Sequence, residues 1–316
     1  CDTGKAALEG FAGVDGVKIM VFFPEDGVSP VQKLQMTTQE GDNTCVVGLK
    51  GNFDDAQSAV KRIFTDEDTR AALDKDGMML SSANSINWGR LAPQIAYYVS
   101  AYCDMVAAGT IAQGDKINVC VPTGNFGNIL AAYIAKKMGL PVNKFICASN
   151  RNNVLTDFFK KGGEYNRNRD FFTTTSPSMD ILISSNLERL LYHVSGSSEK
   201  VAGWMQELSA TGKYKLVAEL MNKLNTEGSY KVAEDVFAKI EAEFDAGCCD
   251  DSHAADTINK LWKDENYLCD THTAVAVRVY EDYRARTGDE TPTVIASTAS
   301  PFKFCRSVIE ALGGTL

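Results

Sequence analysis

The sequence predicts an α/β protein in which parallel sheets carry helices on both faces. Short apolar runs alternate with stretches of helical spacing along the chain, an order typical of parallel sheets. The run 117–121 is mostly β-branched or small and apolar, as in a strand covered on both faces, and it leads through a glycine turn into good helix formers. With 316 residues the chain has room for two domains. We expect residues 1–76 to form part of a small α/β domain and residues 77–316 a large one.

The small domain is expected to alternate helices and strands. Asp2 or Thr3 is the expected N-cap of a helix over residues 5–12. Pro24 breaks the strand that follows, and Pro30 lies in the first turn of the next helix, where its missing N–H is tolerated. The elements expected after the first helix are a strand over 17–23, a helix over 30–38, a strand over 45–49 and a helix over 53–64.

The large domain is expected to begin with a polar stretch, residues 81–90, and a long helix. From about residue 200 the pattern becomes amphipathic helix with two glycine interruptions, which indicates a helical insertion over about 200–265. The other expected elements are helices over 91–107, 129–138, 186–194, 251–264 and 274–284, strands over 117–121, 144–148 and 291–296, and a final helix.

Composition restricts the partners and the compartment. The formal net charge is −9 and there is no basic stripe, so we expect no nucleic-acid partner. No apolar run reaches membrane-spanning length, so we expect no membrane partner. The nine cysteines are scattered, several inside apolar runs, which indicates free thiols and a cytoplasmic location. The sequence indicates no particular oligomeric state.

The turn over residues 122–128 predicts an anion site. Gly124 and Gly127 allow the backbone to approach a ligand closely and to take φ values that other residues avoid. The N–H groups that open the following helix then face this space, which suits a phosphate. Asn125 and Asn128 add uncharged amides. The run matches neither nucleotide loop, with no lysine followed by serine or threonine and no G-x-G-x-x-G; a purely structural turn remains the alternative.

Two further stretches are candidates for site linings. Residues 81–90 gather hydroxyl and amide side chains with no charge until Arg90, whereas a solvated linker normally carries charges; a serine-rich helix cap is the alternative. Ser297 and Thr298 follow the last strand, and ligands bind outside the carboxyl ends of parallel strands. A neutral hydroxyl there is able to hydrogen-bond a pyridine nitrogen and leave it unprotonated, although a plain strand-to-helix turn explains the stretch as well.

Other chemistries are disfavoured. Cys248 lies near His253, and Cys269 lies near His272, but neither spacing fits a standard zinc knuckle, so we expect no metal. No histidine accompanies a G-x-S-x-G elbow, which argues against acyl transfer.

Four motifs together resemble the threonine synthase family. They are residues 2–7 (DTGKAA), 81–87 (SSANSIN), 124–128 (GNFGN) and 297–301 (STASP), in the order and spacing of that family and over nearly the whole chain. The resemblance implies a fold-type II pyridoxal phosphate enzyme, similar to the tryptophan synthase β subunit. It also implies conversion of O-phosphohomoserine and water to threonine and phosphate.

The resemblance also implies roles for individual residues. Thr298 is expected to meet the pyridine nitrogen. Residues expected to hold the cofactor phosphate are Gly124, Asn125, Phe126, Gly127 and Asn128. Residues expected on the substrate side are Asp2, Thr3, Ser82, Asn84, Ser85, Asn87 and Arg90. Of these, Arg90 is the charged donor suited to a phosphate.

Some positions depart from the family pattern. Cys1 stands where the family usually has glycine, and Ser300 where it often has histidine. The family's Schiff-base lysine is expected upstream of Cys1, so the catalytic residue stays unknown here and we expect this chain to be incomplete and inactive alone. The alternatives are another fold-type II lyase, such as a serine or threonine dehydratase, and a non-catalytic phosphate-binding module.

Overall fold

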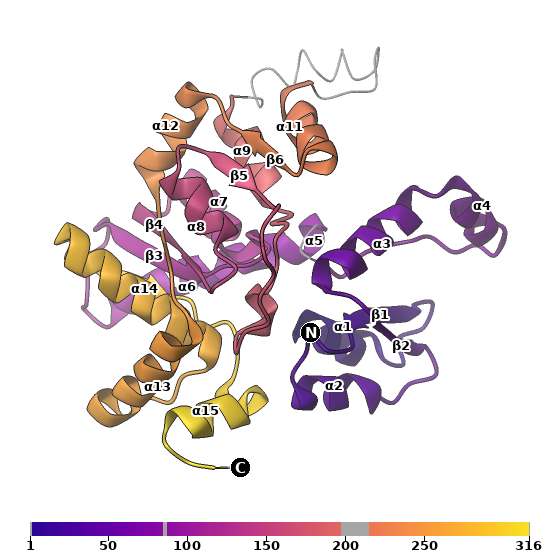
Figure 1. Cartoon of the computed structure of the whole chain (residues 1–316), viewed down its shortest axis with the longest axis horizontal. Helices are drawn as coiled ribbons and strands as arrows, with labels where there is room; N and C mark the ends of the chain where they lie inside the picture. The colour runs from indigo at the N-terminus through magenta and orange to yellow at the C-terminus, as the bar shows by residue number, and fades with distance from the viewer. Residues whose placement is uncertain (1, 85–86, 197–214, 316) are drawn as a thin grey trace.

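The computed structural model describes residues 2–84, 87–196 and 215–315 and shows two α/β units side by side (Figure 1). The smaller unit has a two-stranded parallel sheet in which Ile19 lies opposite Thr44. Its core is formed by Leu8, Val21, Phe23 and Met36. Its elements are α1 (Asp2–Phe11), β1 (Ile19–Pro24), α2 (Pro30–Thr37), β2 (Thr44–Leu49), α3 (Phe53–Thr65) and α4 (Glu67–Lys75).

The larger unit is built on a parallel sheet with the strand order β7-β4-β3-β8. Its strands are β3 (Ile117–Pro122), β4 (Val142–Ser149), β7 (Phe244–Cys248) and β8 (Thr293–Ile295). Every residue of β3 is buried. Val119 and Val121 pack into one hydrophobic cluster and Cys120 into a second, because successive side chains of a strand point to opposite faces.

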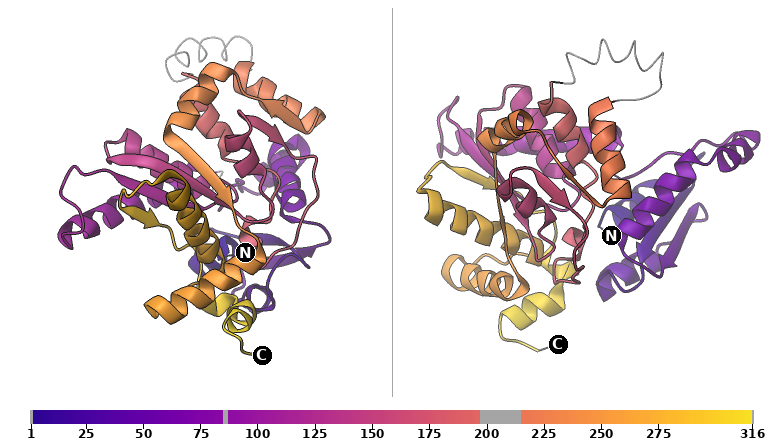
Figure 2. Two further views of the ribbon diagram at one scale, coloured as in Figure 1. Left: turned by 60° about the vertical axis from the view of Figure 1, so that its left-hand side comes forward. Right: turned by 45° about the horizontal axis from the view of Figure 1, so that its top comes forward.

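Helices cover both faces of this sheet, as the second and third views also show (Figure 2). The helices on the first face are α6 (Ile95–Ala107), α7 (Gly127–Lys137), α8 (Val154–Lys160), α9 (Leu187–Val194) and α12 (Glu234–Glu243). Those on the second face are α13 (Asp251–Glu265), α14 (Thr271–Thr287) and α15 (Cys305–Ala311). The predicted α/β class, with parallel sheets and helices on both faces, is confirmed.

The expected insertion over about 200–265 needs correction. Residues 197–214 lie outside the described residues, and α11 (Lys215–Thr226) and α12 are helical as expected. However, β7 pairs with β4 in the main sheet, with Phe145 opposite Phe244, so that this stretch belongs to the framework. A short antiparallel ribbon of β5 (Glu164–Asn166) and β6 (Ser229–Lys231) lies beside α11.

Three helices also differ from expectation. The helix expected over 91–107 is divided into α5 (Trp88–Leu91), a 3-10 turn at Ala92–Gln94 and α6, because Pro93 has no N–H to continue the helix. Helix α8 lies after β4, where no helix was expected. Helix α1 begins at Asp2, so Asp2 and Thr3 both lie in its first turn and neither is its N-cap.

Candidate active site

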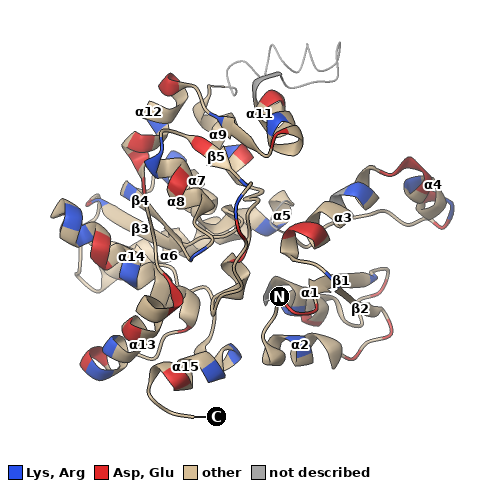
Figure 3. Ribbon diagram, in the orientation of Figure 1, with Lys and Arg blue, Asp and Glu red and all other residues tan. Residues whose placement is uncertain are grey.

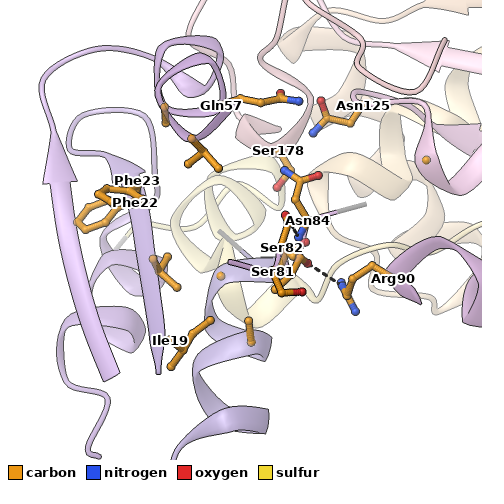
Figure 4. Close-up of a pocket in the computed structure, with 18 of the residues that line it drawn as sticks. Ile19, Phe22, Phe23, Gln57, Ser81, Ser82, Asn84, Arg90, Asn125 and Ser178 are labelled. Carbon is orange, nitrogen blue, oxygen red and sulfur yellow. Dashed lines mark hydrogen bonds between the residues drawn. The ribbon is translucent and has the colours of Figure 1, made fainter. Parts of the chain in front are cut away.

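A cleft of about 2380 Å³ lies between the two units and is lined by both of them (Figure 4). The carboxyl ends of β3 and β8 open into it side by side, since the Ala296 N–H donates to the Cys120 carbonyl at 2.9 Å. Gly124 and Thr298, which follow these strands, both line the cleft. The two strand ends therefore face one cleft.

The turn over residues 124–128, called the anion cup below, ends at the start of α7. Phe126 is the N-cap residue and takes the left-handed conformation with φ 63°, whereas neither Gly124 nor Gly127 has a positive φ. The expectation that the glycines carry the unusual φ is wrong. The Phe126 ring is buried against Phe159 and Phe244, so only its backbone is able to meet a ligand. The Phe126 side chain makes no capping hydrogen bond, and the first N–H groups of α7 face the cup.

Gly124 is needed because backbone atoms come close to it. A Cβ at this position would lie 2.9 Å from the Ser178 carbonyl oxygen and 3.3 Å from the Met179 Cα. Both belong to a 3-10 turn, Pro177–Met179, called the η2 turn below. The Ser184 hydroxyl also donates to the Gly124 carbonyl at 2.8 Å. The backbone at Gly124 is therefore fixed from two sides.

The two asparagines of the cup differ in their surroundings. Asn128 is held by neighbours, since its Oδ1 accepts from the Tyr98 hydroxyl and its Nδ2 donates to Gln94 Oε1 at 3.1 Å. Asn125 has its carbonyl fixed by Asn186 Nδ2 at 2.9 Å, but its buried Oδ1 has no hydrogen-bond partner within the described ranges. The structure thus leaves Asn125, and not the side chain of Asn128, ready for a ligand.

The smaller unit presents a matching group. Gln57 of α3 and Asn125 point toward one another across the cleft (Figure 4). The buried Nε2 of Gln57 also lacks a hydrogen-bond partner among the described residues. Because an unpaired buried donor or acceptor is costly, this donor and acceptor favour a polar group in the space between them. The uncapped N–H groups of α7 and the unpaired Gln57 donor suit a phosphate ester, whereas the unpaired Asn125 Oδ1 suits a hydrogen-bond donor.

The polar stretch at 81–90 folds into one wall of the cleft, with Ser82, Asn84 and Arg90 in the lining. Arg90 Nε donates to the Ala83 carbonyl at 2.8 Å, which holds the guanidinium over this stretch. Asn87 does not line the cleft. Its Oδ1 accepts from the Gly89 N–H at 2.9 Å as the N-cap of α5, and its Nδ2 donates to the Ser82 carbonyl at 2.8 Å.

Asn87 is consequently a structural residue of this wall and not the substrate contact that we expected, because its amide is already used on both sides. Ser85 lies outside the described residues. Thr3 lines the cleft, and Asp2 is the first residue of α1 beside it. Among the described lysines, Lys18 lines the cleft, and it is exposed.

The cleft-lining residues that sequence reasoning missed include Gln57, Ser178 and His272. His272 follows the N-cap of α14, and its Nδ1 lies 3.1 Å from the Asp270 carboxylate. Within the described residues, no group of three or more His, Cys, Asp or Glu side chains is arranged to hold a metal ion. The only available signal for Gln57 was the helical spacing that places it one turn after Asp54.

Charged residues of both signs are distributed over the outer helices (Figure 3). None of the helices in the described ranges is long and apolar enough to cross a membrane. The eight described cysteines are free.

Comparison with solved structures defines the class of protein. Threonine synthase from Brucella melitensis, described as bound to pyridoxal phosphate, has a TM-score of 0.80 and 39% identity, covering 100% of this chain and 61% of that one. Serine racemase from Dictyostelium discoideum shares the fold alone, with 13% identity, a TM-score of 0.52, and 94% of this chain and 73% of that one covered. The fold is that of the fold-type II pyridoxal phosphate enzymes.

Sequence comparison defines the family. A family model described as "Threonine synthase, C-terminal" matches residues 273–315. Human "Threonine synthase-like 1" is 43% identical over 318 residues, and the threonine synthase of Saccharomyces cerevisiae is 35% identical over 328 residues. The chain belongs to the threonine synthase family, as the four motifs predicted. The two alignments cover 98% and 99% of this chain but only 40% and 59% of these relatives.

Proposed function

We propose that the protein carrying this chain is a threonine synthase, which uses pyridoxal phosphate to convert O-phosphohomoserine and water to threonine and phosphate. The observation that carries the proposal is the anion cup, whose α7 N–H groups and Asn125 amide face a cleft at the ends of β3 and β8. The Brucella melitensis relative, described as bound to this cofactor, supports it. When bound, the cofactor supplies an electron sink beside the reacting carbon.

The residues of this chain would bind and orient the reactants. The backbone of residues 124–128 would hold the cofactor phosphate, with the N–H groups at the start of α7 as donors. The Thr298 hydroxyl would hydrogen-bond the ring nitrogen. A neutral donor there disfavours protonation of the ring, in contrast to a carboxylate.

The opposite wall would bind the substrate. Ser82, Asn84 and Arg90 would hold the phosphate that leaves, since a guanidinium forms strong charge-assisted hydrogen bonds to phosphate oxygens. Asp2 and Thr3, at the start of α1, would face the substrate carboxylate, and Gln57 would close the cleft beside the cup. Because Thr3 and Gln57 belong to the smaller unit and the cup belongs to the larger one, binding would bring the units together.

The domain boundaries and the compartment are also proposals. We propose a small domain that includes residues 1–76 and a large domain over residues 77–316; the separate sheets of the two units support this division. We propose a cytoplasmic location from the free cysteines. The Schiff-base lysine is proposed to lie upstream of Cys1.

An assay of the intact protein with pyridoxal phosphate and O-phosphohomoserine tests the proposal. We expect threonine and inorganic phosphate to appear in equal amounts. Because the chain also resembles threonine synthase-like 1, the amino-acid product must be identified as well as the phosphate. Release of phosphate with a different amino-acid product would identify another lyase. Absence of both products in protein saturated with cofactor would contradict the proposed activity.

A further inference from the structure

Asp270 makes more contacts than a helix cap requires. It is 1% exposed and precedes α14, where its Oδ1 accepts from the His272 N–H at 2.8 Å and from the Thr273 N–H at 3.3 Å. These two bonds already cap the helix. The carboxylate also binds the side chains of both residues, with His272 Nδ1 at 3.1 Å and a hydrogen bond from the Thr273 hydroxyl. Each of these side chains then contacts a different segment that lines the cleft.

The first connection runs through His272, which is 2% exposed. Its Nε2 accepts a hydrogen bond from the Ser178 N–H at 3.2 Å. Because Nε2 is the acceptor, the ring proton lies on Nδ1, which donates to Asp270. Ser178 belongs to the η2 turn, and the Ser178 carbonyl oxygen leaves no room for a Cβ at Gly124. His272 therefore holds the backbone wall behind the anion cup.

The second connection runs through Thr273. Burial by itself would raise the pKa of Asp270, but the hydrogen bonds from His272 and Thr273 hold it below its ordinary value. The ionised carboxylate only accepts, so the Thr273 hydroxyl donates to it. The Ser297 hydroxyl, 3.1 Å from Thr273 Oγ1, is then the donor to Thr273. Ser297 directly precedes Thr298, so this connection holds the other end of the site.

We propose that Asp270, His272 and Thr273 form a positioning unit that keeps the anion cup and the Thr298 turn at a fixed separation. The inference rests on the proposed function, in which these two parts hold opposite ends of one cofactor. The three residues act through Ser178 and Ser297, so they are positioning residues and not catalytic ones.

The chain contains a natural control for this idea. At the start of α13, Asp250 accepts from the His253 N–H at 2.9 Å and lies 2.7 Å from His253 Nδ1, a cap of the same chemistry. The side chains of Asp250 and His253 are 50% and 49% exposed, and neither residue lines the cleft. Any effect of the His272 side chain beyond capping should therefore be absent at His253.

The first test compares His272→Leu with His253→Leu in the full chain. The dissociation constant of inorganic phosphate is measured by competition with pyridoxal phosphate, and hydrogen exchange is followed in peptides that cover residues 174–181. We expect His272→Leu to weaken phosphate binding about tenfold and to speed exchange over this segment, because the Ser178 N–H loses its acceptor. His253→Leu should change neither quantity.

The second test separates the two connections and does not depend on His272. Thr273→Val removes the hydroxyl at nearly constant volume, and Thr273→Ser keeps it. We expect Thr273→Val to shift the absorption and fluorescence maxima of the bound cofactor while phosphate affinity stays within about twofold of wild type. Thr273→Ser should restore the wild-type spectrum.

The outcomes distinguish this inference from the proposed function. Equal effects of His272→Leu and His253→Leu, or an unchanged spectrum in Thr273→Val, would overturn the positioning unit. Failure of the wild-type protein to bind pyridoxal phosphate or inorganic phosphate would refute the proposed function. In that case the exchange comparison still decides the structural claim: faster exchange in His272→Leu alone supports it, and unchanged exchange overturns it.

Discussion

At Gly124, backbone atoms and not side chains set the limit on residue size. The Ser178 carbonyl and the Met179 Cα would both lie too close to a Cβ, and neither is able to rotate away as a flexible side chain would. The sequence suggested a special glycine here for close approach of a ligand and for an unusual φ, and the structure shows that Phe126 has the unusual φ. Close approach of two backbone segments far apart in sequence is not visible in a local pattern.

We therefore expect Gly124→Ala to weaken binding of pyridoxal phosphate at least about tenfold, since an overpacked site costs about 1–3 kcal/mol when the backbone must shift. Fluorescence titration of the purified variant measures this. Gly10→Ala is the matched control, because Gly10 lies in α1 with nothing within 4 Å of its Cβ position. Unchanged cofactor affinity in Gly124→Ala would show that the cup is wider than the structure indicates.

Asn128 gives a second prediction at the same scale. Asn128→Asp replaces the amide that donates to Gln94 by an oxygen and places a negative charge beside the cup. We expect the dissociation constant of pyridoxal phosphate to rise by about tenfold or more, from like-charge repulsion and the lost donor. Tyr98→Phe, which removes the hydroxyl bound to Oδ1, should have a smaller effect. Equal affinity of Asn128→Asp and wild type would contradict the assignment of the cup.

At the scale of elements, α3 joins the smaller unit to the larger one. Asp54, in its first turn, accepts a hydrogen bond at 2.9 Å from the Leu182 N–H. Burial raises the pKa of Asp54 to about 6, more than the backbone hydrogen bonds from Leu182 and Ile183 lower it. One turn further along the helix, Gln57 faces the cup. The orientation of α3 therefore depends on a buried acidic group.

This contact predicts a pH dependence. Because the pKa of Asp54 is higher in the folded than in the unfolded chain, the folded state binds more protons between about pH 4 and about pH 6. The contribution of Asp54 to the free energy of unfolding should fall by about 3 kcal/mol as the pH rises through this window, and it should stay level above about pH 7.

Chemical denaturation of wild type and Asp54→Asn at several pH values measures this contribution as a difference. We expect that difference to change between about pH 4 and about pH 6, since the amide that replaces the carboxylate does not titrate, and to be constant above about pH 7. Asp55→Asn is the control, because the Asp55 side chain is exposed on the next residue of α3. A difference that does not vary with pH would show that Asp54 is not buried as the structure indicates.

The elements also show how far the sequence could predict the fold. The strands β1, β2, β3, β4 and β8 and most helices were predicted because their apolar spacing repeats over several residues, as in the fully buried β3, whereas β5, β6 and β7 were not expected. The break near Pro93, the helix α8 and the membership of β7 in the main sheet were missed. Pro93 acts over a single turn, α8 is short, and the place of β7 depends on its pairing with β4, which lies far earlier in the sequence. Asn87 was assigned to the substrate because a motif does not show which amides are already bonded within the fold.

At the scale of the whole molecule, the cleft is formed by segments from both ends of the chain. The start of α1, the wall at 81–84, the cup and the Thr298 turn lie in separate parts of the sequence and meet between the two units. Gln57 and Asn125 face each other there without a partner in the described part of the chain, which indicates a site completed by a ligand. The central claim is that this ligand is pyridoxal phosphate, held by its phosphate in the cup.

An equilibrium titration of the protein with pyridoxal phosphate, with and without inorganic phosphate, tests this claim most directly. The account predicts saturable binding of one cofactor per chain, with an apparent dissociation constant that rises in proportion to added phosphate as the two compete for the cup. Cofactor binding that phosphate does not weaken, or no saturable binding at all, would contradict it.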